Sequence, residues 1–398
     1  MTLPRYQEIA DELLAEIGDG RFSVGSMLPT EIDLCERFGV SRFTVREALR
    51  QLHEKGILTR RRGSGTVVQN LHPNTAYVRS IGTLDELLQY PPEMRLIVMG
   101  QQAFGKDVLE LLLSTGTDEV VAVYCEPDKE GKPQDPIKEF ALEKCLPVHQ
   151  PSNFNDQETL STLASFDADL MVMAFVNVFV PQDARETPKM GSICFHPSLL
   201  PKYRGPSAVN WPIIMGDTTS GYSWFYPSDG LDEGDSLMQW ECPLGPDDTV
   251  IDLYFKKIYP SSVSSVLEVC DLFRSGNPPR IVADEAQASY ERRCTKKHAH
   301  IDWHKPVAQV YNLIRGTNPA PGAWTTLDGN EISVYDSRRI DGDGLSGRVM
   351  AISEEGVTVQ CIGGRILLKR VKASGGTKQP AAEWAEAIGL NVKDNLGT

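Results

Sequence analysis

The sequence lacks any run of 18 apolar residues, and its N-terminus has no charged segment followed by an apolar one. A membrane-spanning helix needs about 20 apolar residues, and a secretory leader needs that charged-then-apolar order. We therefore expect a cytoplasmic protein that has no membrane partner. The eight cysteines are scattered without a CxxC pair, which is typical of reduced thiols and predicts no metal site.

Net positive charge is also missing, because the chain carries a net charge of −14. Residues 1–72 contain ten basic and ten acidic side chains, so residues 73–398 carry the whole excess. Within the neutral part, residues 41–62 hold seven basic groups against two acidic ones. Such a concentrated patch can bind phosphates whatever the global charge, although a solvated helix face has the same composition.

The first 70 residues have the pattern of three short helices and a β-hairpin. Thr30 is expected to cap the second helix and Ser41 the third, and short β-prone runs flank Gly63-Ser64-Gly65. The predicted elements are helices within residues 5–17, 28–40 and 42–55 and a hairpin over residues 57–69. This order predicts a winged helix-turn-helix domain over residues 1–72, followed by a linker over residues 73–93.

The exposed face of the third predicted helix carries arginines, which bind phosphates and guanine edges when a helix enters a major groove. The stretch "LPTEIDLCERFGVSRFTVREALRQLHEKGIL" and the Arg-Gly wing resemble the DNA-binding domain of GntR-family bacterial repressors. The resemblance implies a DNA operator as partner, although Ile32 stands where many members have an arginine. It implies DNA contacts by Arg42, Thr44, Arg46, Arg62 and Gly63. Members usually dimerise through a sensing domain that is replaced here, so a homodimer stays an open alternative.

After Pro91-Pro92 the pattern becomes β-α-β, with "MRLIVMG", a helical "FGKDVLELLLSTG" and "EVVAVYCEPD". This order predicts an α/β, Rossmann-like domain over residues 94–290. The turn "GQQAFG" has Gln102 where a dinucleotide fingerprint needs its second glycine, so we expect no NAD. Further strands are expected at 168–176, 192–196 and 222–226. Short β-prone runs at 331–335, 347–352, 356–361 and 365–372 predict a small OB-like β-barrel over residues 291–398.

His196 is expected to end a strand, where open α/β sheets place their ligand crevice. A Gly-punctuated acidic loop, "SDGLDEGDSL", follows the predicted strand over 222–226 and contains Asp232. A carboxylate beside an imidazole stabilises its protonated form and fixes its orientation, as general acid–base catalysis requires. The residues alone also allow a purely structural histidine with a distant aspartate.

Residues 94–398 resemble the folate-dependent formyltransferase family, which includes methionyl-tRNA formyltransferase and the hydrolase part of 10-formyltetrahydrofolate dehydrogenase. The motifs that carry the resemblance are "HPSLLPKYRGPSAVNWPI", "DGLDEGD", "CPLGPDDTV", "IRGTNPAPGAWT" and "GRILLKRVKASGG". The resemblance implies 10-formyltetrahydrofolate or tetrahydrofolate as ligand, with His196 and Asp232 as the catalytic pair. It implies a folate pocket formed by Val178, Phe179, Val180, Cys194, Ser198, Leu199, Leu200, Pro201 and Asp232.

Cys194 stands where the transferases of this family have an asparagine that helps to hold the formyl oxygen, and a thiol is a much weaker donor. The short "PDKEGK" loop and the acidic body favour water or a small amine as formyl acceptor over tRNA. Three alternatives remain: methionyl-tRNA formyltransferase activity, a folate-sensing regulator with an inactive body, and two halves that never cooperate. Cys194 as a nucleophile is disfavoured, because only His196 could activate it.

Overall fold

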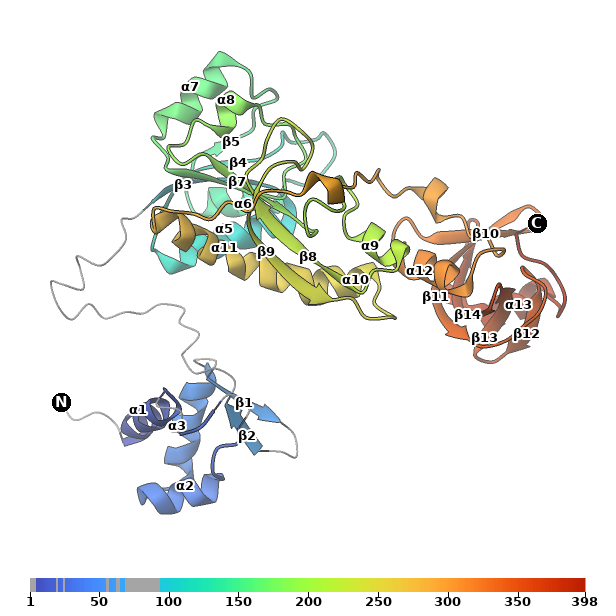
Figure 1. Cartoon of the computed structure of the whole chain (residues 1–398), viewed down its shortest axis with the longest axis horizontal. Helices are drawn as coiled ribbons and strands as arrows, with labels where there is room; N and C mark the ends of the chain where they lie inside the picture. Colours follow the sequence, from blue (N-terminus) through green and yellow to red (C-terminus); the bar gives the residue numbers. More distant parts are fainter. Residues whose placement is uncertain are drawn as a thin grey trace. The chain divides into compact units, whose positions relative to one another are not determined.

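The computed structural model describes residues 5–18, 21–23, 26–54, 57–61, 65–68 and 94–397. The chain divides into two units, Met1–Tyr90 and Pro91–Thr398 (Figure 1). The predicted linker over residues 73–93 lies outside the described residues. No helix in the described ranges combines the length and the apolar character that a membrane crossing requires.

The first unit is a winged helix-turn-helix, as predicted. Its elements are α1 (Arg5–Gly18), α2 (Glu31–Phe38), α3 (Arg42–Glu54) and the antiparallel strands β1 (Leu58–Arg61) and β2 (Gly65–Val68). The Thr30 side chain accepts a hydrogen bond from the Asp33 backbone N–H, and Ser41 Oγ accepts one from that of Thr44. Both caps are those expected from the sequence. The three helices enclose a core that includes Ile9 and Leu52.

The second unit begins with a seven-stranded sheet in the order β5-β4-β3-β6-β7-β8-β9. The first five strands in this order are parallel to one another, whereas β8 runs antiparallel to both of its neighbours, β7 and β9. The strands are β3 (Arg95–Gly100), β4 (Glu119–Tyr124), β5 (Val148–His149), β6 (Leu170–Ala174), β7 (Ser192–His196), β8 (Thr219–Phe225) and β9 (Ser236–Pro243).

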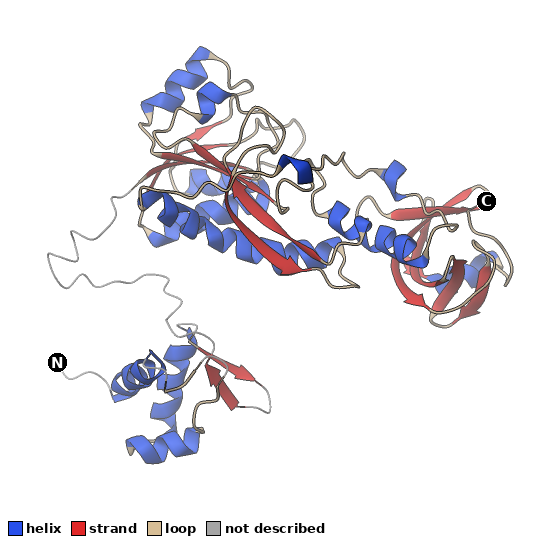
Figure 2. Ribbon diagram, viewed as in Figure 1, coloured by secondary structure: helices blue, strands red, loops and turns tan. Residues whose placement is uncertain are grey.

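Helices cover both faces of this sheet, so its central strands are apolar on both sides (Figure 2). In β3, Leu96 and Val98 join the core beneath α5 (Gln102–Thr115) and α11 (Tyr259–Arg274). Ile97 and Met99 alternate onto the other face, where α7 (Gln157–Ser165) and α8 (Gln182–Arg185) contribute to the core. The remaining helical segments of this domain are α6 (Pro136–Glu143), α9 (Asn210–Met215), α10 (Val250–Leu253) and the π-helix Tyr254–Ile258.

Because the chain continues from β3 to β4 on one side and later to β6 on the other, the strand order reverses between β3 and β6. Open α/β sheets place ligands at the carboxyl ends of strands beside such a switch point. The topology therefore marks the ends of β3, β6 and the adjacent β7 as the region to inspect for a site.

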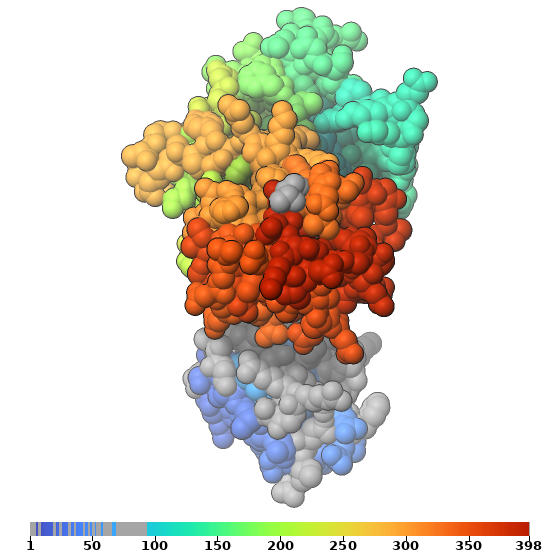
Figure 3. All heavy atoms as spheres, turned by 90° about the vertical axis from the view of Figure 1, so that its right-hand side faces the viewer, coloured from blue at the N-terminus to red at the C-terminus, as the bar shows by residue number. Residues whose placement is uncertain are grey.

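The C-terminal part is a domain built on an antiparallel sheet, and the β-rich domain expected over residues 291–398 is thereby confirmed. It faces the viewer in Figure 3 (orange to red). Its strands follow the order β10-β11-β14-β13-β12, with β15 beside β14. They are β10 (Ala323–Leu327), β11 (Asn330–Ile340), β12 (Val349–Ser353), β13 (Gly356–Cys361), β14 (Gly364–Ala373) and β15 (Gln379–Pro380), accompanied by α12 (Val307–Gly316) and α13 (Ala381–Ile388). Closure into a barrel stays a prediction. The sequence analysis missed β5, β9, β10 and β15.

Candidate active site

His196 is the last residue of β7, which the buried side chains of Ile193 and Phe195 anchor in the sheet. The imidazole is buried, with 6% exposure. Its Nε2 lies 2.9 Å from the backbone oxygen of Tyr203. A carbonyl oxygen only accepts, so Nε2 carries the proton and donates it. The other ring nitrogen, Nδ1, lies 3.5 Å from Oδ2 of Asp232.

Asp232 belongs to the loop that joins β8 to β9 and has a left-handed backbone with φ of +50°. Its Oδ2 accepts a 2.8 Å hydrogen bond from the backbone N–H of Gly205. The strands β7 and β8 are antiparallel, with His196 opposite Ser223, so the two residues do not meet as neighbouring carboxyl ends. The loop after Phe225 folds back and returns the carboxylate to the histidine. The structure thus brings together the two side chains that the sequence paired.

The turn after His196 is fixed from several directions. Ser198 Oγ donates to the backbone oxygen of Lys202 at 2.7 Å, and the Leu200 N–H donates to Ser223 Oγ at 3.0 Å. Gly205 has a φ of +105°, and a Cβ there would lie 2.4 Å from the backbone oxygen of Glu291. Only glycine fits this position, and its N–H orients the Asp232 carboxylate.

The residues of the predicted folate pocket differ in exposure. Val178 and Phe179 are exposed, at 39% and 63%, and are available to a ligand. Val180, Cys194 and Leu200 instead pack in one apolar cluster. Ser198 is buried, and Leu199 and Pro201 are half-buried.

Cys194 is a buried thiol whose Sγ lies 3.7 Å from the Phe195 backbone oxygen. Burial raises the pKa of this thiol, and the negative charge of Asp232 raises it further. The thiolate is therefore disfavoured. Because only the thiolate is strongly nucleophilic, this environment agrees with the sequence-based view that Cys194 is no nucleophile.

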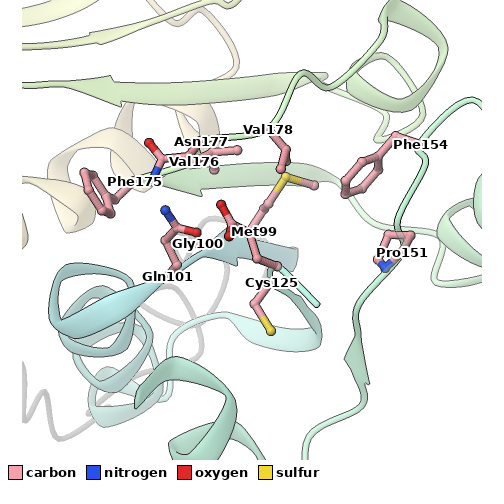
Figure 4. Close-up of a pocket in the computed structure, with 11 residues that line it drawn as sticks. Met99, Gly100, Gln101, Cys125, Pro151, Phe154, Phe175, Val176, Asn177 and Val178 are labelled. Carbon is pink, nitrogen blue, oxygen red and sulfur yellow. The ribbon is translucent and has the colours of Figure 1, made fainter. Parts of the chain in front are cut away.

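A pocket lies where β3, β4 and β6 end, beside the switch point of the sheet. Apolar side chains such as Met99, Phe154 and Val178 line it together with the amides of Gln101 and Asn177 (Figure 4). Neither member of the histidine–aspartate pair lines this pocket. Val178 lines this pocket and also belongs to the predicted folate pocket, and Met99 shares an apolar cluster with Cys194.

The sequence analysis missed a polar network around the loop between β8 and β9, which carries Asp232. The buried guanidinium of Arg204 makes two hydrogen bonds to the carboxylate of Glu285, and its Nη1 also donates to Tyr290 Oη at 2.6 Å. The Tyr290 hydroxyl donates to Glu233, the residue after Asp232. Arg204 lies within the motif "HPSLLPKYRG", which was the available signal, whereas nothing in the spacing pointed to Tyr290.

In the first unit, Arg42 and Arg46 are exposed on α3. Thr44 is half-buried, and its hydroxyl lies 3.0 Å from Ser41 Oγ, in the first turn of the helix. Arg62 and Gly63 lie outside the described residues. DNA contacts by these five residues stay a prediction.

Comparison with protein families divides the chain in the same way. The family described as "Formyl transferase" matches residues 94–260, and "Formyl transferase, C-terminal domain" matches residues 293–389. "Bacterial regulatory proteins, gntR family" matches residues 5–68.

Among curated proteins, the cytosolic 10-formyltetrahydrofolate dehydrogenase of Xenopus laevis is 33% identical over 320 residues, covering 76% of this chain and 35% of that protein. The chain thus spans about a third of the length of that relative. The methionyl-tRNA formyltransferase of Trichlorobacter lovleyi is 32% identical over 295 residues, covering 73% of this chain and 93% of that protein.

Among solved structures, HypX from Aquifex aeolicus in complex with tetrahydrofolic acid matches with a TM-score of 0.52 and 19% identity, covering 76% of this chain and 49% of that chain. This likeness shows a shared fold. Together with the histidine–aspartate geometry, the family matches lead to one conclusion: the chain belongs to the formyl transferase family and carries a GntR-family domain at its N-terminus.

Proposed function

We propose that the second unit removes the formyl group from 10-formyltetrahydrofolate at His196 and Asp232, with water or a small amine as acceptor. We further propose that the first unit binds a DNA operator. The observation that carries the enzymatic proposal is the 3.5 Å separation between His196 Nδ1 and Asp232 Oδ2. The relatives named for 10-formyltetrahydrofolate and for methionyl-tRNA formyl transfer support the choice of formyl donor.

The protonated form of His196 satisfies both of its neighbours. Its Nε2–H donates to the Tyr203 carbonyl oxygen, while a proton on Nδ1 faces the carboxylate of Asp232. At 3.5 Å the Nδ1–Oδ2 contact is longer than a direct N–H···O hydrogen bond. The Nδ1 proton is therefore attracted by the carboxylate without being committed to it, and a substrate atom can take it up.

In the proposed reaction the acceptor attacks the formyl carbon of the folate, and a tetrahedral oxyanion forms. The positive charge of His196 stabilises this oxyanion, since a preorganised charge acts strongly in a buried site. His196 then gives its proton to N10 as the C–N10 bond breaks. With water as acceptor a new C–O bond forms, the Asp232 carboxylate takes up the proton that the attacking water loses and passes it back to His196, and the products are formate and tetrahydrofolate.

Folate binding is proposed along Val178 and Phe179, whose exposed apolar side chains precede α8. The turn Ser198–Pro201 forms the opposite wall in this proposal. The net charge of −14 disfavours tRNA, whose phosphates require compensating positive charge.

The test is to incubate the full chain with 10-formyltetrahydrofolate in acceptor-free buffer and to measure tetrahydrofolate and formate. Release of both in equal amounts supports hydrolysis, and release only after a small amine is added supports transfer. The variant His196→Ala should lose activity. An unchanged rate in that variant contradicts the mechanism.

A second candidate function is folate sensing by an inactive formyltransferase body. Cys194 favours it, because a thiol replaces the amide donor of the transferases. The retained His196–Asp232 pair opposes it, since binding alone does not require an acid–base pair. The candidate predicts folate-dependent operator binding, measured by gel shift at several salt concentrations, with negligible turnover.

A further inference from the structure

A buried arginine outside the recognised motifs contacts the loop that carries Asp232. Arg185 is the last residue of α8, in the connection between β6 and β7, and is 6% exposed. Its Nη1 donates to the backbone oxygen of Pro227, and its Nη2 donates to Oδ1 of Asp229. These contacts join α8, which follows the predicted folate-pocket residues 178–180, to the first half of the loop over residues 226–235, which carries Asp232.

The two halves of the loop between β8 and β9 are held differently. The second half is anchored by the Tyr290 hydroxyl on Glu233 and by the Gly205 N–H on Asp232. Within residues 94–397, the hydrogen bonds to Pro227–Leu231 from side chains outside the loop all come from Arg185. Leu231, next to Asp232, is 59% exposed and supplies little packing of its own.

The placement of Arg185 is costly for a residue that only fills the core. Burying a guanidinium removes its hydration, and its Nε is buried without a hydrogen-bond partner. Its ion-pair partner Asp229 has a side chain that is 70% exposed, so solvent screens the pair. The backbone of Arg185 is nevertheless fixed, because the buried Ser192 Oγ donates to its carbonyl oxygen at 2.6 Å. Arg185 is thus a rigid support whose hydrogen-bonding capacity is directed at the loop.

We propose that Arg185 is a positioning residue, which holds Pro227 and Asp229 so that Asp232 stays within reach of His196. Asp232 has a left-handed backbone, which aspartate adopts more readily than most residues but which still costs free energy that the surrounding contacts must offset. Releasing the first half of the loop lets this backbone relax and carries the carboxylate away from the imidazole. The catalytic part of this inference rests on the proposed function, whereas the restraint on the loop does not.

The test compares Arg185→Met with Arg274→Met in the full chain. Arg274 is a control of equal side-chain burial, because both arginine side chains are 7% exposed and both have an Nε without a partner; its own partners are Asp118, which is buried, and Asp271, both away from the site. We expect Arg185→Met to lower kcat for formyl release about 100-fold, since a misplacement of about 1 Å costs that much. KM should change less than kcat. In Arg274→Met, kcat should stay within about threefold of the wild-type value.

Amide hydrogen exchange over residues 226–235 gives a readout that needs no turnover. The Ser228 N–H donates to the backbone oxygen of Glu233 at 3.1 Å, so the exchange rate of this amide reports whether the loop keeps its conformation. We expect at least about tenfold faster exchange there in Arg185→Met and an unchanged rate in Arg274→Met. Added methylguanidine should partly restore both kcat and protection in Arg185→Ala, which a merely structural loss would not show.

Asp229→Ala provides a variant on the solvent side in case Arg185→Met does not fold. It should show the same changes in smaller measure. Wild-type kcat and wild-type exchange in a folded Arg185→Met, or in Asp229→Ala if the former is unfolded, overturn the proposal. If the wild-type chain releases no formyl group, the proposed function fails, and the exchange comparison alone decides whether Arg185 holds the loop.

Discussion

Replacing Asp232 by Asn removes one negative charge from the candidate site with little change in shape. The Asn side-chain oxygen can still accept the hydrogen bond from the Gly205 N–H, which is 2.8 Å long in the wild-type chain. The loop should therefore keep its conformation, and the loss of the charge-assisted bond should cost only about 1 kcal/mol of stability. What disappears is the attraction between the carboxylate and the protonated imidazole of His196.

The size of that attraction follows from the geometry. At 3.5 Å and an effective dielectric constant of about 20, two unit charges attract by about 5 kcal/mol. If this energy stabilises the charged histidine in the transition state, its loss slows the reaction by a factor between about 10³ and 10⁴. The same reasoning predicts a small change in KM, because the formyl donor contacts other residues in the ground state.

The assay is formyl release from 10-formyltetrahydrofolate, with kcat and KM measured separately. Asp235→Asn is the control, since Asp235 lies in the same loop and interacts with the Ala283 N–H and with Arg280 rather than with His196. Its kcat should stay within about threefold of wild type. If Asp232→Asn keeps more than a tenth of the wild-type kcat while folded, the electrostatic role assigned to Asp232 is refuted.

Three further predictions address other parts of the chain. Gly205→Ala should destabilise the protein by about 2 kcal/mol or more and abolish activity, because the added Cβ would lie 2.4 Å from a backbone oxygen. In the control Gly131→Ala, where the added Cβ would meet no atom within 4 Å, the temperature of thermal unfolding should fall less. Iodoacetamide at about pH 8 should alkylate the exposed Cys145 and spare Cys194, because burial raises the pKa of the Cys194 thiol and so lowers its thiolate fraction. If mass spectra show that Cys194 is alkylated and activity is lost in step with it, the nucleophile hypothesis is revived. Arg46→Ala should weaken binding to a DNA fragment selected by the wild-type chain about tenfold or more in gel shifts, and equal affinity would remove Arg46 from the DNA interface.

Much of the fold could be predicted because its signals are local. The caps at Thr30 and Ser41 are short-range hydrogen bonds, so the residues that form them lie within three positions of one another. The continuous apolar runs of β3 and β6 indicate strands buried on both faces. The strand β9 was missed because "SLMQWECP" directly follows a Gly-punctuated acidic loop and contains Gln239, Glu241 and Pro243, which weaken the apolar strand pattern.

The candidate site shows the opposite case. The sequence indicated His196 at a strand end and Asp232 in an acidic loop, but the separation of 36 positions leaves their distance undetermined. The positions of the strand ends do not account for the pair either, because β8 runs antiparallel to β7. The pair forms because the loop folds back and the Gly205 N–H, contributed by a different turn, orients the carboxylate.

The sequence by itself determined the order of elements, the winged helix, the α/β class and the identity of the two ionisable residues, since these depend on periodicity, caps and motifs within short windows. Only the tertiary structure decided which loop supports the aspartate. The guanidinium of Arg185 reaches Pro227 and Asp229, 42 and 44 positions further along the chain. Contacts of this length depend on how strands pair and loops fold back, and a buried arginine at the end of a four-residue helix has no distinguishing pattern in the sequence.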